Sequence, residues 1–299
     1  MALVAAACLV MDHSIVRASE TSAVTNEQGC VRQRGGPQDP GMVPPPVMDA
    51  CLGPYSLRIP ANYFDNQMGP NFDGSFGLYL EYPEMTPFAP GERTHLTLDV
   101  ATRTVNIGYD YLDRVSAEEF MHRQTVPDGS GEDAPEMDIQ TRIKGEEIDG
   151  LTPYYANIAA YRAHYLAMGL KPSNSIMDAS YYKDWYVNRD AQGRIETIIK
   201  CTSHEVKETG VEYRDGKLAR SNERQLPECE HTFVIPEMNA AVKINYVRFA
   251  FKDWKKIQER ARSALLKLSR DADLPAVNEE TEVVLLQSII PKQHKENES

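Results

Sequence analysis

Two stretches in the first half of the chain, GLYLEY at residues 77–82 and TVNIGY at residues 104–109, decide the fold class. Their side chains alternate between apolar and other types, which is typical of strands that bury one face. The same alternation occurs in further segments, at residues 56–60, 94–100, 185–187, 194–201, 231–235 and 241–251. Short polar segments separate several of these strands, as hairpin turns do, at residues 101–103 (ATR), 190–193 (DAQG) and 215–216 (DG). We therefore expect antiparallel sheets.

Three segments are predicted to form helices. Ser116 followed by Glu119 is a capping box, and Thr152 followed by Pro153 favours a second helix that Gly169 ends. The second helix would carry an apolar stripe of Tyr154, Ile158, Tyr161, Tyr165 and Met168. The third helix is amphipathic, with Trp254, Ile257, Ala261, Leu265 and Leu268 on one face. Strand runs followed by a helix occur twice. The predicted fold is therefore α+β, with two domains that each have a mainly antiparallel sheet and one or two packed helices.

The two ends of the chain differ from its body. Residues 1–18 resemble a signal peptide cut after Ala18, possessing an apolar core but no basic residue before it, as in a truncated leader. Cys8 is a weaker candidate for lipoprotein acylation. Residues 19–50 are rich in Pro and Gly and are predicted to be an extended arm. We expect domains at 51–175 and 176–299, the second closing with an edge strand at 282–287.

The chain has 299 residues and a net charge of −12, which argues against a nucleic-acid partner. Beyond residue 18, no segment is apolar enough to predict a membrane helix. The composition is that of a globular protein of one or two domains. An exported chain of this charge would favour partners that carry basic surfaces.

Four cysteines remain after residue 18, and an even number in an exported chain predicts two disulfides. Of the three possible pairings we favour Cys30–Cys51 and Cys201–Cys229, because each pair lies within one local segment. The alternative for the second pair is a zinc site that also uses His204 and His231, but its spacing is not that of a standard finger.

No catalytic signature stands out in the sequence. The segments GSFG at 74–77 and GSG at 129–131 lack the spacing of a nucleophile elbow, and no phosphate-binding glycine loop is present. The adjacent carboxylates fit a solvated surface better than a glycosidase pair. We expect no catalytic residue, metal or cofactor, and the 15 tyrosines instead suit a protein interface.

Two parts of the chain resemble a known family. Residues 52–64 (LGPYSLRIPANYF) and 77–87 (GLYLEYPEMTP) are similar to the opening of bacterial immunity proteins that neutralise phospholipase effectors of the type VI secretion system. Residues 246–257 (YVRFAFKDWKKI) resemble that family's last strand and helix. The resemblance implies a periplasmic binding protein of two α+β domains without enzyme activity. Its partner would be a secreted lipase.

An inhibitor of a lipase needs exposed aromatic and acidic side chains on its binding surface. Three segments offer them, and the candidate residues are Phe64, Phe72 and Asp73 on the loop at 65–73, Glu132 and Asp133 on an acidic loop, and Tyr181, Tyr182 and Trp185. The alternatives are an exported cell-envelope hydrolase with an unrecognised site, and an envelope- or solute-binding protein.

Overall fold

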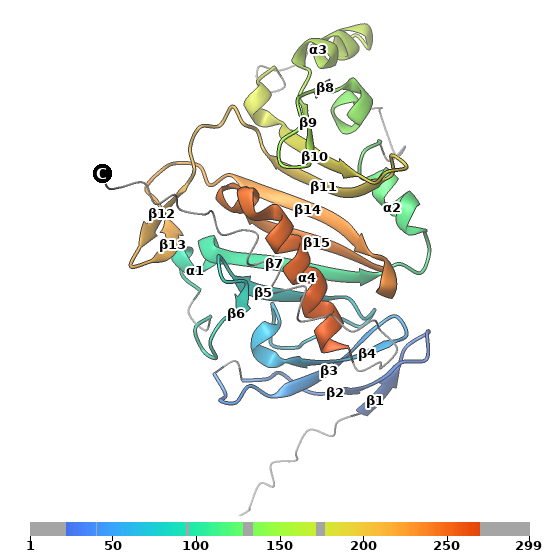
Figure 1. Ribbon diagram of the computed structural model, residues 1–299, viewed down its shortest axis with the longest axis vertical. Coiled ribbons are helices and arrows are strands. Elements are labelled where there is room, and N and C mark those ends of the chain that lie inside the picture. Colours follow the sequence, from blue (N-terminus) through green and yellow to red (C-terminus); the bar gives the residue numbers. More distant parts are fainter. Residues whose placement is uncertain (1–21, 40, 94–95, 128–133, 172–176, 270–299) are drawn as a thin grey trace, which may run out of the picture.

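The computed structural model describes residues 22–39, 41–93, 96–127, 134–171 and 177–269 (Figure 1). Its centre is a nine-stranded sheet whose paired strands are all antiparallel. In spatial order the strands are β6 (Thr86–Pro87), β5 (Phe76–Glu81), β7 (Thr104–Tyr111), β15 (Ala240–Val247), β14 (Glu228–Ile235), β11 (Ile195–Thr202), β10 (Lys183–Arg189), β9 (Thr152–Tyr155) and β8 (Ile143–Lys144). The α+β prediction is confirmed.

Strands from both halves of the chain meet in this sheet. β7 pairs with β15 along six residues, from Asn106 opposite Asn245 to Tyr111 opposite Ala240. This pairing joins segments more than 120 residues apart and makes the sheet continuous across the predicted boundary near residue 175. The division into domains at that residue stays a prediction.

One face of the sheet is covered by helix α4 (Trp254–Leu268), which crosses in front of the strands in Figure 1. The predicted stripe is confirmed at Trp254, Ile257, Ala261 and Leu265, which are buried in the main core. Burying a side chain such as that of Ile257 or Leu265 stabilises the fold by about 1.5–3 kcal/mol. The buried hydroxyl of Tyr109 on β7 also donates a hydrogen bond to the carbonyl of Ala261, at 2.8 Å.

Cross-strand register separates the two faces of the sheet. Leu78, Ile107 and Ile244 lie opposite one another and are fully buried in the core that contains α4, so we call this the closed face. The side chains between them along the strands, such as Asn106 and Asn245, point to the opposite side, which we call the open face.

Two hairpins stand at the lower end of the molecule in Figure 1, β1 (Ser22–Thr25) with β2 (Val31–Arg34) and β3 (Val47–Leu52) with β4 (Tyr55–Pro60). The predicted Cys30–Cys51 disulfide is present and fastens the first hairpin to the second. The predicted arm therefore contains strands, and its last residues already belong to the core through Met48 and Ala50.

Helix α2 (Ala117–Arg123) begins as predicted, since the Ser116 hydroxyl accepts a hydrogen bond from the Glu119 amide at 3.1 Å. The expected strand at 94–100 and turn at 101–103 are wrong over residues 98–103, which form helix α1 (Leu98–Arg103). Thr97 caps this helix by accepting from the Val100 amide, a local bond that outweighs the alternating pattern. Residues 94–95 lie outside the described residues.

The predicted start of the second helix is also wrong. Thr152 and Pro153 belong to β9, and helix α3 (Ile158–Ala167) is capped instead by the Asn157 side chain, which accepts from the Ala160 amide. Gly169 follows the helix with a φ of 73°, as a helix-ending glycine does. Thr152 and Pro153 are in the sheet and not in the helix because β9 pairs with β10.

The hairpin β12 (Val211–Arg214) with β13 (Lys217–Arg220) confirms the predicted turn at Asp215 and Gly216. The strand expected at 241–251 ends instead at Val247 and continues as a 3-10 turn, η6 (Arg248–Asp253). The short 3-10 turns η1 to η5 span Ala61–Tyr63, Pro135–Met137, Ile139–Thr141, Ala179–Tyr181 and Pro236–Met238. The expected signal peptide at 1–18, with Cys8, and edge strand at 282–287 lie outside the described residues.

Candidate partner-binding surface

The loop predicted to bind a partner through Phe64, Phe72 and Asp73 is divided by burial. Phe64 is fully buried and packs edge-on against Phe76, with ring centroids 6.1 Å apart. Phe72 is 80% exposed, and the Arg34 guanidinium lies 3.9 Å from its ring centroid. Phe72 therefore remains available to a partner, whereas Phe64 belongs to the core.

Asp73 organises this loop. Its carboxylate accepts hydrogen bonds from the amide and the hydroxyl of Ser75, at 2.9 and 2.7 Å, and the hydroxyl bond in particular lowers the pKa of Asp73. Arg32 on β2 donates to the carbonyls of Pro70 and Asn71. The loop is thus held against the first hairpin, and Asp73 has its main partners within it.

The three aromatic residues predicted near residue 182 are also divided by burial. Tyr181 is 68% exposed, whereas Tyr182 and Trp185 are only 7% and 2% exposed. Tyr182 packs against Tyr161 of α3 with ring centroids 5.1 Å apart, and burial raises its pKa. Only Tyr181 of the three therefore offers its ring to solvent.

Trp185 is buried in a second core cluster that includes Met121 and Ile139, and two cations lie over its ring. The Arg142 guanidinium lies 3.9 Å and the Lys200 amine 4.2 Å from its ring centroid. Burial lowers the pKa of Lys200 to about 8, against the opposing effect of Glu230. Arg142 also donates to the carbonyls of Lys183 and Glu136, so it ties the start of β10 to η2. Trp185 therefore belongs to the packed interior and not to an exposed surface.

Tyr181 lies near helix α3, because the Tyr182 ring contacts both Tyr181 and Tyr161 of α3, with ring centroids 5.6 and 5.1 Å apart. Apart from Arg162 and His164, helix α3 consists of aliphatic and tyrosine side chains, yet Tyr161 is its only buried residue. Three side chains at the end of the helix or just beyond it are exposed to solvent, namely Leu166 (54% exposed), Met168 (43%) and Leu170 (43%). We call these three residues with Tyr181 the α3 surface. Exposed apolar side chains of this size are typical of a surface that binds a partner.

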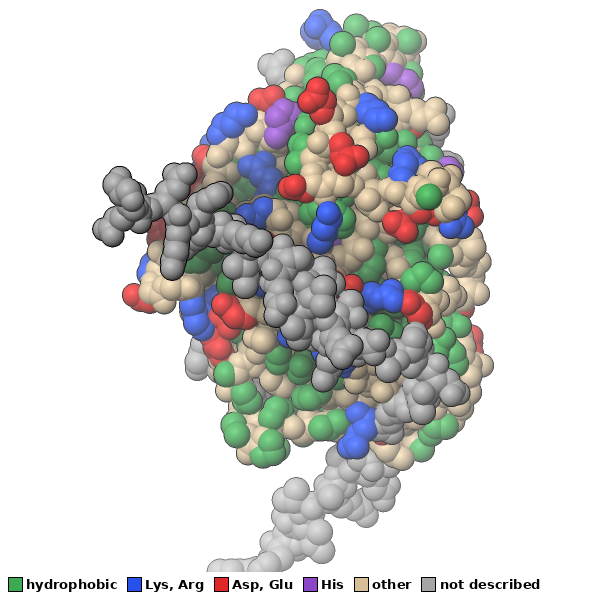
Figure 2. All heavy atoms as spheres, in the orientation of Figure 1, with side chains coloured by type: hydrophobic (Ala, Val, Ile, Leu, Met, Phe, Trp, Pro, Cys, Tyr) green, Lys and Arg blue, Asp and Glu red, His purple; other side chains and the backbone are tan. Residues whose placement is uncertain are grey.

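Leu166 of the α3 surface also faces a hollow. A pocket of about 480 Å³ is lined by Ile158, Ala159, Ala163, Leu166, Arg162 and Met177. Only Arg162 among these side chains is charged. Hydrophobic side chains are exposed at this upper end in Figure 2. Glu132 and Asp133, predicted to bind on an acidic loop, lie outside the described residues. The described Glu136 accepts a hydrogen bond from Tyr165 of α3 at 3.1 Å.

The structure does not bring the two predicted surfaces together. The loop with Phe72 leads into β5, whereas Tyr181 leads into β10, and five strand-to-strand steps separate β5 from β10. At about 4.8 Å a step this places the two strands about 24 Å apart. The hairpins near Phe72 and helix α3 lie at opposite ends of the long axis in Figure 1. The expectation that both contact one partner stays a prediction.

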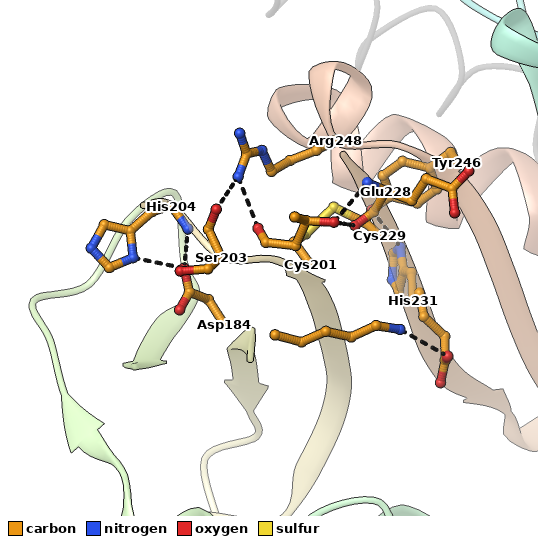
Figure 3. The surroundings of a disulfide bond; sticks show 12 residues. Asp184, Cys201, Ser203, His204, Glu228, Cys229, His231, Tyr246 and Arg248 are labelled. Carbon is orange, nitrogen blue, oxygen red and sulfur yellow. Dashed lines mark hydrogen bonds and ion pairs between the residues drawn. A yellow bond between two sulfur atoms is a disulfide. The ribbon is translucent and has the colours of Figure 1, made fainter. Parts of the chain in front are cut away.

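The second predicted disulfide, Cys201–Cys229, is present and joins directly opposed residues of β11 and β14 (Figure 3). His231 is fully buried, and burial lowers its pKa to about 4, while its hydrogen bond to Gln258 at 2.9 Å acts in the opposite direction. His204 lies at the surface and bonds the buried Asp184 carboxylate at 2.7 Å. The alternative zinc set is therefore wrong, and no metal-binding cluster occurs among the described residues.

Arg248 holds the loop that follows Cys201. Its guanidinium donates to the carbonyls of Thr202, Ser203, Val206 and Glu208. Figure 3 shows Arg248 and the His204–Asp184 pair on either side of Ser203. Both histidines therefore have structural roles, because His231 fills the core and His204 bonds Asp184 beside the loop that Arg248 holds.

Residues on the open face escaped sequence analysis. Asn245 and Lys243 are exposed although β15 is a central strand, and Asn106 and Gly108 opposite them are partly exposed. The alternation of polar with apolar residues along β7 and β15 could have indicated that each strand has a polar face. The sequence does not indicate that these two strands pair, which is what makes their polar residues one surface.

No protein-family model matches the chain, and no curated protein matches it. Among solved structures, an immunity protein of the Stenotrophomonas maltophilia type IV secretion system is similar, with a TM-score of 0.66 and 27% sequence identity. The match covers 84% of this chain and 100% of that chain. The chain resembles a secretion-system immunity protein.

This similarity supports the expected immunity role in its general form. It does not extend to the type VI system or to a lipase target, since the similar protein serves a type IV system. Both predicted disulfides are confirmed, and they fit an oxidising compartment. Within the described part of the chain, every helix is too short or too polar to cross a membrane.

Proposed function

We propose that this protein is a periplasmic immunity protein that binds a secreted effector and blocks its activity. The observation that carries the proposal is the similarity to an immunity protein over 84% of this chain and the whole of that protein. The exposed apolar α3 surface supports it, because the part of the fold that the structure describes leaves these side chains uncovered. A binding protein of this kind needs no catalytic group.

The proposed effector is a lipase, as the sequence resemblance implies. The mouth of an enzyme that acts on lipid is apolar, and the α3 surface offers matching apolar side chains. The net charge of −12 would accelerate association with a basic effector. The resemblance favours delivery by a type VI system, whereas the structural neighbour serves a type IV system.

The test uses the disulfide-bonded protein as bait against the secreted proteins of the producing strain. We expect it to retain one effector, and the purified effector to lose phospholipase activity when the protein is added in equimolar amount. Loss of a different hydrolytic activity would refute the lipase assignment alone. Turnover of lipid, glycan or peptide by the protein itself would refute the immunity role.

A further inference from the structure

A pocket of about 320 Å³ opens on the open face of the sheet. Its floor consists of Tyr79 on β5, Asn106 on β7, and Asn245 and Val247 on β15. The register places Tyr79 opposite Asn106 and Asn106 opposite Asn245, so these side chains stand on the same face. Pairing of β5, β7 and β15 therefore creates the floor.

The wall of this pocket comes from α1 and from the segment around β13. Leu98 and Ala101 on α1 line it on one side, and Arg220 and Leu226 line it on another. Leu98 is 74% exposed, and Leu96, which also lines the pocket, is 65% exposed. Two leucines this exposed beside a concave surface form an apolar rim that the described residues leave uncovered.

The floor has hydrogen-bonding groups that the fold leaves unused. The side-chain amides of Asn106 and Asn245 make no hydrogen bond to any other described residue, although many asparagines elsewhere do. Directly opposed residues have Cβ atoms about 4.5–5.5 Å apart, so the two amides are neighbours. A pair of adjacent amides can donate to and accept from the backbone of one extended peptide.

Two charged residues line the pocket, and only one of them, Arg220, bonds to other parts of the described chain through its side chain. Arg220 donates to the carbonyls of Gly210 and Glu223, both at 2.6 Å, so its guanidinium is held within the wall. Glu228 also lines the pocket, is exposed, and forms no ion pair within the residues described. An incoming group therefore meets an available carboxylate beside an apolar rim.

We propose that this pocket receives an aliphatic side chain from an extended loop of a partner protein, with a Lys or Arg of that loop beside Glu228. Its volume is at the lower limit of small-molecule sites and suits a side-chain anchor. The loop backbone would bond the two asparagines. The inference rests on the proposed function and names the chemistry of the effector segment.

The sheet edges favour this mode over strand addition. β8 and β6 have only two residues each, and Pro87 lies in β6. Short or proline-containing edges resist pairing with another chain. A partner that uses backbone hydrogen bonds would therefore find unused polar groups on the open face.

The first test uses a phage library of disulfide-cyclised heptapeptides selected on the full protein, and the Ala101→Trp variant as counter-selection. Ala101 is exposed and lines the pocket, so the indole would fill it without entering the core. We expect enriched peptides with an aliphatic residue next to Lys or Arg, and at least tenfold weaker binding to Ala101→Trp. Ala191→Trp, in the exposed turn between β10 and β11, is the matched control and should bind them unchanged.

Glu228→Gln should weaken the same peptides about three- to tenfold, and added salt should reduce the difference. Asn245→Ala provides a second pocket variant if Ala101→Trp unfolds at a lower temperature than the wild type. Enriched peptides that bind the pocket variants as tightly as the wild type, or no enrichment at all, would overturn the proposal.

A second readout separates the pocket from the proposed function. In cells exposed to the effector, Ala191→Trp should protect and Ala101→Trp should protect less at equal protein level. Full protection by Ala101→Trp would overturn the pocket while the immunity role stands. Failure of the wild-type protein to protect would instead refute the immunity role.

Discussion

Helices α4 and α3 both carry many apolar residues, but they use them differently. α4 buries Trp254, Ile257, Ala261 and Leu265 on one side and presents basic side chains on the other. α3 buries Tyr161 alone and leaves Leu166 more than half exposed. Folding explains the apolar residues of α4, whereas Leu166 of α3 has no such role among the residues that the structure describes. A partner is the simplest reason to retain this side chain.

The largest expected effect is on the α4 side of this comparison. Trp254→Ala should lower the free energy of unfolding by about 3–5 kcal/mol, because it empties a packed site between α4 and His231 of β14. Chemical denaturation followed by circular dichroism measures this change. A loss below about 1 kcal/mol would show that α4 is not a main support of the sheet.

The Cys201–Cys229 disulfide lies on the closed face and should contribute nearly as much. Replacing both cysteines with Ala should destabilise the fold by about 3–4 kcal/mol, since the bond closes a loop with a sequence separation of 28. Cys30–Cys51 has a separation of 21 and should contribute a similar amount. Unchanged denaturation midpoints after both cysteines are replaced would contradict this estimate.

His231 gives the closed face a pH dependence. Its pKa falls from an ordinary value near 6.5 to about 4 in the folded protein, so below pH 6.5 the unfolded state binds a proton that the folded state refuses. The stability present above pH 6.5 should therefore be lost as the pH falls toward 4, by about 3 kcal/mol from this group. His231→Gln should have a flatter stability profile between pH 6.5 and 4. Parallel profiles would contradict the assignment.

Leu166→Ala on α3 should have the smallest effect on folding and still matter for binding. Because the side chain is mostly exposed, we expect its stability to change by no more than about 0.5 kcal/mol. Binding of the effector should weaken by more than about 1 kcal/mol, measured by calorimetric titration. Tyr181→Ala should behave in the same way. The binding of Phe72→Ala, which lies at the other end of the molecule, is measured for comparison with these two variants. A large loss of stability in Leu166→Ala would assign α3 to the core instead.

Features that depend on local sequence were predictable. The Ser116 cap, the α4 stripe and both disulfides each involve residues that are near one another in the chain. Helix α1 and the start of α3 were missed because Thr97 and Asn157, rather than the alternation or Thr152, supply the capping bonds. At both places a helix cap and a strand-like pattern occur close together in the sequence. Only the pairing of strands in the folded protein determines which of the two structures forms.

Features that depend on distant residues were not predictable. Trp185 looked like an exposed aromatic, but Arg142, 43 positions earlier, lies over its ring. The pocket on the open face requires Asn106 and Asn245 to become neighbours through the pairing of β7 with β15. The apolar character of α3 was visible in the sequence, but its exposure was not, because a stripe of this kind ordinarily packs.

The most direct test of the immunity role is a competition between the producing strain and its own mutant. A mutant that lacks this protein should be killed by its parent on solid medium, and a restored gene should rescue it. Parents that lack either the type IV or the type VI apparatus identify the delivering system, because killing should disappear with one of them. Equal survival of mutant and parent, with the effector demonstrably secreted, would contradict the account.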